Sequence, residues 1–217
     1  MEKCILFDLD GTLTESGEGI VKSVQYALEK MGKPEADAAK LRVFIGPPLI
    51  EQFMEYSGMS RAEAEKAVVY YRERYEATGI FENRPYPGIE EMLKILKEKG
   101  NTLAVASSKP EYYVLKILEH FHIQNYFDEV AGATMDEKRT DKADVIEEAL
   151  KRLQLSEKRE NIFMVGDKAH DIIGARKNGI PCIAASYGYG TMQELRQEKP
   201  FRIVRSVDEL QEALLSL

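Results

Sequence analysis

Short, fully apolar runs alternate along this chain with longer segments in which apolar residues recur every three or four positions. The short runs are typical of strands buried on both faces of a parallel sheet, and the longer segments have the spacing of amphipathic helices. The strand candidates are residues 4–7, 102–106, 130–131, 162–165, 181–185 and 201–204. Because strands and helices alternate, the sequence predicts an α/β fold with a doubly wound, Rossmann-like parallel sheet.

One long stretch interrupts this alternation, because residues of about 16 to 84 have helical spacing and no strand pattern. After a polar run at 15–19, which we interpret as a flexible link, a helix is expected to end near Gly32. Ser60 and Glu63 form a capping-box pattern at the start of another helix. We therefore expect an all-helical insertion, residues 16–84, in an α/β core made of residues 1–15 and 85–217.

Composition and charge narrow the classes of function. The formal net charge is −7 and no basic patch or tail is visible, which disfavours a binder of nucleic acid polymers or of anionic membranes. No segment reaches the roughly 20 apolar residues of a membrane span, and the first apolar run is too short for a signal peptide. We expect a cytoplasmic protein whose two cysteines, Cys4 and Cys182, are reduced and buried.

Polar chemistry begins abruptly after the first strand, in the segment Asp8-Leu9-Asp10-Gly11-Thr12-Leu13-Thr14. If the chain stays extended, Asp8 and Asp10 point the same way and stand about 6.6 Å apart along the backbone. One phosphorus and one metal ion fit between them. Gly11 permits a sharp exit from the strand and a close approach of the backbone to a ligand. Ligands of open α/β sheets bind beyond the carboxyl ends of the strands, so we predict the site there.

This segment resembles the first motif of the haloacid dehalogenase-like superfamily in its phosphatase form. The resemblance implies an aspartyl-phosphate mechanism in which Asp8 is the nucleophile and Asp10 is the general acid and base. The dehalogenase branch lacks the second carboxylate, so Asp10 favours phosphate chemistry. In this superfamily a helical insertion at this point is a cap over the active site, and residues 16–84 match it in position and helical character.

Two further strand candidates end in polar residues that match motifs of the same superfamily. Ser107 corresponds to the hydroxyl residue of the second motif, and with Ser108 it precedes a helix N-terminus, where an anion is favoured. Asp167 and Asp171 resemble the paired acids of the fourth motif. Carboxylate oxygens suit Mg²⁺. We expect Asp8, the backbone carbonyl of Asp10 and Asp167 as direct ligands, with Asp171 acting through water.

The third motif requires a lysine, and two lysines compete for this role. Lys138 and Lys142 both precede a predicted helix, and the proline that often follows this lysine in the superfamily is absent. A lysine in the first turn of a helix opposes the helix dipole, so something other than helix stability should explain it. We interpret Lys142 as the phosphate-binding lysine and keep Lys138 as the alternative.

These features predict a Mg²⁺-dependent phosphatase that hydrolyses a small phosphate monoester through an aspartyl-phosphate. Within the superfamily the chain is most similar to the phosphoglycolate phosphatase-like group, which includes phosphatases of nucleoside 5′-monophosphates. We rank a phosphoglycolate-type substrate first and a 5′-nucleotidase second. A β-phosphoglucomutase-like phosphomutase and a catalytically silent binding protein on the same fold remain as further alternatives.

Specificity is expected to lie in the helical insertion, because the core motifs contact only the phosphoryl group and the metal. A carboxylate substrate would use a cation, for which Arg42 and Lys22 are available. A nucleotide would use an aromatic ring, for which Phe44 or Tyr56 could serve. Together with Gly11 and Ser108 in the core, Arg42 and Phe44 are the predicted substrate-binding residues.

Overall fold

The computed structural model describes residues 2–136, 139–157 and 159–217. The chain divides into two compact units, of which one comprises Met1–Thr14 and Pro85–Leu217 and the other Glu15–Arg84. A short two-stranded sheet, β2 (Thr14–Glu15) with β3 (Arg84–Pro85), lies where the chain passes from one unit to the other.

The larger unit is built on a parallel sheet, which has six strands in the described part of the chain and the order β5-β4-β1-β6-β7-β8. Its strands are β1 (Cys4–Phe7), β4 (Thr102–Pro110), β5 (Glu129–Ala133), β6 (Ile162–Gly166), β7 (Cys182–Ala185) and β8 (Arg202–Val204). All residues of β1 and β7 are buried, as expected for strands covered on both faces. The predicted α/β fold class is confirmed.

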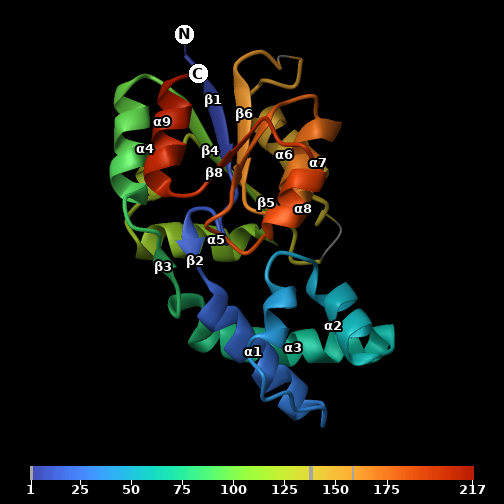
Figure 1. Cartoon of the computed structure of the whole chain (residues 1–217). Helices are drawn as coiled ribbons and strands as arrows, with labels where there is room; N and C mark the ends of the chain where they lie inside the picture. Colours follow the sequence, from blue (N-terminus) through green and yellow to red (C-terminus); the bar gives the residue numbers. More distant parts are fainter. Residues whose placement is uncertain (1, 137–138, 158) are drawn as a thin grey trace. The chain divides into compact units, whose positions relative to one another are not determined.

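Helices cover both faces of this sheet. They are α4 (Ile89–Glu98), α5 (Glu111–His120), α6 (Lys142–Arg152), α7 (Ala169–Lys177), α8 (Met192–Gln197) and α9 (Val207–Leu215). Figure 1 shows α4 and α9 on one side of the sheet and α6 and α7 on the other. The apolar faces of α6 and α7 pack on β1, β4 and β6 in one buried cluster that includes Val145, Ile146 and Ile172.

The strand order reverses beside β1. Phe7, the last residue of β1, pairs with Val105 on one side and with Val165 on the other. After β1 the chain continues into β4 and β5, whereas β6 leads to β7 and β8 on the opposite side. Ligands of doubly wound sheets bind where the strand order reverses in this way, so the carboxyl ends of β1 and β6 are the expected binding position.

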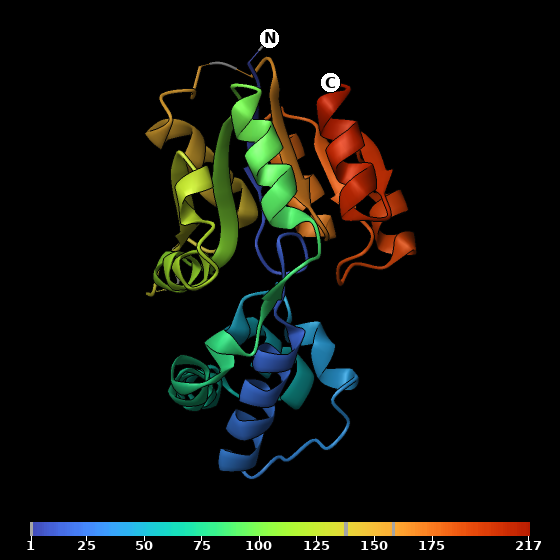
Figure 2. The ribbon, with the colours of Figure 1, turned by 90° about the vertical axis from the view of Figure 1, so that its left-hand side faces the viewer.

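The smaller unit is helical. It contains α1 (Gly17–Lys30), α2 (Leu49–Ser57), α3 (Arg61–Ala77) and short 3-10 helices at Lys40–Phe44 and Gly79–Phe81. The view in Figure 2 shows its helices packed on one another. The predicted capping box at the start of α3 is confirmed, because the Ser60 side chain accepts a hydrogen bond from the backbone N–H of Glu63 and the Glu63 carboxylate accepts one from the backbone N–H of Ser60.

Several boundaries differ from the predictions. The polar run at 15–19 is not a free link, because α1 already begins at Gly17. Strand β4 continues past the predicted 102–106 to Pro110, so Ser107 and Ser108 lie inside the end of a strand. The short helix α8 was not predicted, although Thr191 and Glu194 form its capping box.

Among the described residues, none of the helices combines the length and the apolar character that a membrane span requires.

Candidate active site

The site is centred on Asp8, the first residue after β1. Its backbone N–H donates to the carbonyl of Val165, which holds the residue at the end of the sheet between β4 and β6. Lys142, the first residue of α6, places its ammonium 2.6 Å from Oδ1 of Asp8. The same ammonium lies 2.9 Å from Oδ1 of Asp171 and donates to the backbone carbonyl of Ala106. The sequence therefore brings a buried cation directly to the proposed nucleophile.

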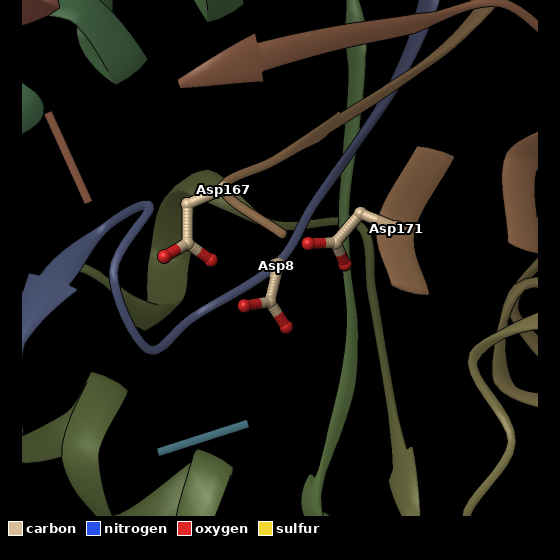
Figure 3. A group of neighbouring side chains, drawn as sticks. All are labelled: Asp8, Asp167 and Asp171. Carbon is tan, nitrogen blue, oxygen red and sulfur yellow. The ribbon is translucent and has the colours of Figure 1, made fainter. Parts of the chain in front are cut away.

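Three buried carboxylates converge here. Oxygen atoms of Asp8, Asp167 and Asp171 all lie within 4.8 Å of one another. Figure 3 shows the three groups, which come from the ends of β1 and β6 and from the first turn of α7, facing a common space. Such a cluster of hard oxygen ligands suits a divalent cation of the Mg²⁺ type.

The electrostatics of the cluster also favour a bound cation. Burial raises the pKa of the Asp8 carboxyl to about 6, against the lowering effect of Lys142. Burial also raises the pKa of Asp167 well above its usual range, and the charges of Asp171 and Asp8 raise it further. For Lys142, burial lowers the pKa, but Asp171 and Asp8 more than offset this and the pKa is raised overall. Lys142 thus pairs with two of the three carboxylates, and a bound cation would relieve the repulsion that remains among them.

Backbone groups hold the acids of the cluster in place. The backbone N–H of Tyr189 donates to Oδ2 of Asp167 at 2.6 Å, and that of Lys168 donates to Oδ2 of Asp171 at 3.0 Å. A Cβ at Gly11 would overlap the Asp167 carboxylate, and one at Gly190 would overlap the Asp167 carbonyl. Gly11 also has a φ of 86°, where a side chain is strained. The predicted close backbone approach at Gly11 is therefore an approach to Asp167.

Asp10 is not one of the three clustered carboxylates, although its charge adds to the effect of burial in raising the pKa of Asp8. Oδ2 of Asp10 lies 2.6 Å from the ammonium of Lys109, and the side chains of the two residues are 9% and 7% exposed. Its Oδ1 is buried and has no hydrogen-bond partner among the described residues. The two aspartates of the Asp-x-Asp segment therefore each pair with a lysine of their own.

The predicted hydroxyl residues lie on β4, beside β1. Ser107 is 2% exposed and its Oγ accepts a hydrogen bond from the backbone N–H of Lys109. Ser108 is half-buried. His170, which lies between Asp167 and Asp171 in the sequence, is exposed. Lys138, the alternative third-motif lysine, lies outside the described residues, so Lys142 is the candidate whose contacts are known.

The residues predicted to set substrate specificity lie in the helical unit, Glu15–Arg84. Phe44 is 1% exposed and packs on Phe53 and Tyr56, with ring centroids 4.9 and 5.4 Å apart, so its ring belongs to the core of that unit. Lys22 pairs with Glu18 and Glu82. Arg42 is exposed. Their predicted contacts with substrate remain predictions.

Sequence reasoning missed two parts of the site. Lys109 adjoins Ser107 and Ser108 at a strand end, and that position beside a predicted phosphate site was the available signal. The segment Gly188-Tyr189-Gly190 approaches Asp167 with its backbone, and its two glycines were the only signal.

Comparison with known proteins agrees with this geometry. A family model described as haloacid dehalogenase-like hydrolase matches residues 5–185. The 5′-nucleotidase of Pseudomonas aeruginosa is 43% identical over 212 residues, which cover 98% of this chain and 95% of that protein. The tyrosine-protein kinase PtkA of Mycobacterium tuberculosis is 39% identical, with 97% of this chain and 72% of the kinase covered.

More distant relatives carry a third name. The phosphoglycolate phosphatase of Pseudomonas syringae pv. tomato is 29% identical over 229 residues, covering 100% of this chain and 81% of that protein. Among solved structures, that of a predicted phosphatase from Clostridium acetobutylicum has a TM-score of 0.96 and is 45% identical, with both chains fully covered.

Proposed function

Because this chain belongs to the haloacid dehalogenase-like hydrolases and is a phosphatase of phosphate esters, we propose that it hydrolyses nucleoside 5′-monophosphates through a phosphorylated Asp8. The observation that carries the substrate is the 43% identity to a 5′-nucleotidase over almost the whole of both chains. The phosphoglycolate-type substrate, which the sequence alone favoured, is the substrate named for a less similar relative, the phosphoglycolate phosphatase of Pseudomonas syringae pv. tomato at 29% identity. The order of the two substrates is therefore reversed.

Asp8 is the proposed nucleophile. Its carboxylate stands at the carboxyl end of the central strand, where its backbone is fixed by the hydrogen bond to Val165. One carboxylate oxygen attacks phosphorus in line with the ester oxygen, and the bond from phosphorus to that ester oxygen breaks. Lys142, 2.6 Å from Asp8, limits the repulsion between the carboxylate and the negatively charged phosphoryl oxygens.

Asp10 is the proposed general acid and base. In the first step it gives a proton to the leaving ester oxygen, and in the second it removes a proton from the water that attacks the phosphorylated Asp8. Ser107 and Ser108, at the end of the neighbouring strand, would hold the phosphoryl oxygens through hydroxyl and backbone groups. The separate surroundings of Asp8 and Asp10 support this division of roles.

The three buried carboxylates fit a divalent cation, and we propose Mg²⁺. Asp8, Asp167 and Asp171 would hold it, together with the backbone carbonyl of Asp10. A bound Mg²⁺ supplies positive charge that stabilises the phosphoryl oxygens and lessens the repulsion within the acidic cluster. We accordingly expect turnover to be lost in excess chelator and restored by Mg²⁺.

We further propose that the helical unit, Glu15–Arg84, acts as a cap that sets substrate choice. Arg42 is the suitable test residue, since it is exposed and its loss leaves the core of the unit intact. Phe44 is unsuitable, because truncating a buried phenylalanine costs about 3–5 kcal/mol of stability.

The test is a substrate panel with released inorganic phosphate as the readout. We expect kcat/KM for nucleoside 5′-monophosphates to exceed that for 2-phosphoglycolate and hexose phosphates at least tenfold. A preference for 2-phosphoglycolate that is lost in Arg42→Ala would restore the original order. Conversion of a sugar phosphate without release of inorganic phosphate would indicate a phosphomutase. Transfer of phosphoryl groups from ATP to tyrosine residues belongs in the panel, because one relative is named a tyrosine-protein kinase.

A further inference from the structure

A second lysine lies at the site without a role in the reaction described above. Lys109 is near the carboxyl end of β4, and its side chain is 7% exposed. Its ammonium lies 2.6 Å from Oδ2 of Asp10. Burying a lysine is costly unless the charge is paired. The buried ion pair between Lys109 and Asp10 is therefore part of the structure of the site, unlike an ion pair on the solvent-exposed surface.

The two carboxylate oxygens of Asp10 have different surroundings. Oδ2 accepts the hydrogen bond from Lys109, whereas Oδ1 is buried without a hydrogen-bond partner in the described part of the chain. Buried carboxylate oxygens are almost always hydrogen-bonded, because leaving one unpaired costs free energy. Here the unpaired oxygen belongs to the residue proposed to exchange protons with the substrate. Oδ1 is thus the oxygen that can face a reacting group.

We propose that Lys109 is a positioning residue that anchors Asp10 through Oδ2, so that Oδ1 carries out both proton transfers. This inference rests on the proposed function and deepens it. In the first step the bond between phosphorus and the ester oxygen breaks, and the leaving oxygen keeps the electron pair and takes the proton from Oδ1. In the second step water bonds to phosphorus and gives a proton to Oδ1, while the Asp8 oxygen leaves with its electron pair.

If Lys109 positions Asp10, the activity lost on removing Lys109 should depend on the leaving group of the substrate. A nucleoside leaves as an alcohol and needs the proton from Asp10, whereas p-nitrophenolate is stable enough to leave without one. Loss of a well-positioned acid therefore slows the nucleotide more than the aryl phosphate. A variant that is merely unstable, or that binds the phosphoryl group poorly, loses both activities in similar proportion.

The experiment compares kcat/KM for adenosine 5′-monophosphate and for p-nitrophenyl phosphate, in the presence of Mg²⁺. We expect Lys109→Met to lose about 100-fold on the nucleotide, within the range of general acid catalysis, and about threefold or less on the aryl phosphate. Asp10→Asn should show the same selectivity. The double variant, Lys109→Met with Asp10→Asn, should have the same kcat/KM as Asp10→Asn alone, because both changes remove the same function, the positioned acid.

Two further variants serve as a control and as a replacement for Lys109→Met. Lys116→Met is the matched control, because Lys116 is exposed on the next helix and its ammonium lies over the Tyr112 ring, 4.4 Å from the centroid. It should leave both rates unchanged. Retained turnover of p-nitrophenyl phosphate shows that Lys109→Met is folded. If that variant does not fold, Lys109→Gln provides the same comparison.

Equal losses on the two substrates in Lys109→Met, with weaker inhibition by inorganic phosphate, would overturn the inference and make Lys109 a phosphoryl-binding cation. Additive losses in the double variant would also overturn it. A wrong proposed function gives a different result. Asp10→Asn would then lose activity on both substrates equally or on neither, whatever the effect of Lys109→Met.

Discussion

Lys142 and Asp8 are 134 positions apart in the sequence, and their charged groups lie 2.6 Å apart at the end of the central strand. Asp8 follows β1 and Lys142 begins α6, the helix that comes after β5. Because β1 and β5 belong to one parallel sheet, the segments that follow them lie at the same edge of that sheet. The Lys142 ammonium also contacts Asp171, so one cation connects the proposed nucleophile with the acidic cluster.

The first prediction is that Lys142→Met loses both activity and stability. The variant leaves Asp8 and Asp171 buried without their cation, so we expect the metal-free protein to lose about 3–5 kcal/mol of unfolding free energy. The kcat should fall about 100-fold or more, as when one stabilising donor is removed from a charged transition state. Urea unfolding in chelator and steady-state kinetics in Mg²⁺ measure the two effects.

Lys177→Met is the control, since Lys177 forms an exposed ion pair with Asp141 on the same unit. Exposed pairs contribute about 0–1 kcal/mol, so this variant should resemble the wild type. Lys138→Ala should also lose far less activity than a change at Lys142. Small and equal losses at Lys138 and Lys142 would show that neither lysine holds the phosphate.

The second prediction concerns pH. The pKa of Asp8 is raised by burial to about 6, and that of Asp167 is raised well above its usual range. An acid whose pKa is higher in the folded protein takes up protons on folding. The cluster therefore destabilises the metal-free protein increasingly as pH rises from about 4, the value in the unfolded chain, through the folded values.

Mg²⁺ should offset this loss, because it binds the ionised carboxylates. Thermal unfolding with and without Mg²⁺ at pH 5 and pH 8 measures this stabilisation. We expect the increase in Tm on adding Mg²⁺ to be larger at pH 8 by on the order of 5 °C. Asp167→Asn, which removes one acid of the cluster, should lessen the difference. A Mg²⁺ effect that is equal at the two pH values in the wild type would contradict the assignment of the cluster as the metal site.

Much of this arrangement was predictable from the sequence. The strands around the site are continuous apolar runs, and aspartates that directly follow such runs must gather at one edge of a parallel sheet. Asp8 and Asp167 could therefore be grouped before any contact was known. Helix α8 escaped prediction because its six residues are too few to show periodicity and only Leu195 is buried.

Other parts depend on relationships that single residues do not reveal. Lys109 meets Asp10 only because β4 lies beside β1 and continues past Ala106. The backbone N–H that Tyr189 offers to Asp167 is common to every residue except proline, so side-chain identity gives no signal for it. Phe44 looked like a candidate ring for a nucleobase, but its burial against Phe53 depends on packing within the helical unit.

The third prediction compares two glycines with the same backbone requirement. Gly11 and Gly179 have φ values of 86° and 68°, so alanine at either costs about 1–2 kcal/mol of backbone strain. Only at Gly11 would the added Cβ overlap Asp167, because nothing lies within 4 Å of the Cβ position at Gly179. Gly11→Ala should therefore raise the Mg²⁺ concentration for half-maximal activity about 10–100-fold, as expected when a ligand is displaced.

Gly179→Ala should bind Mg²⁺ like the wild type and lose only the stability that the backbone strain costs. Titration of activity with Mg²⁺ separates the two variants, and thermal unfolding of Gly179→Ala measures the contribution of the strain alone. An unchanged Mg²⁺ requirement in Gly11→Ala would show that the close approach of Gly11 to Asp167 has no part in metal binding.

Transfer of the phosphoryl group to Asp8 is the step on which the proposed mechanism depends. The most direct test mixes excess protein with labelled adenosine 5′-monophosphate and Mg²⁺, stops the reaction in acid within one turnover, and maps the label by peptide mass spectrometry. If Asp8 is the nucleophile, a phosphoryl group will be found transiently on the peptide that contains Asp8 in the wild type, and for longer in a variant that is slow in the second step. The label should be absent in Asp8→Asn, which should be folded and inactive. Turnover that proceeds without label on Asp8, or that survives in Asp8→Asn, would contradict the proposed mechanism.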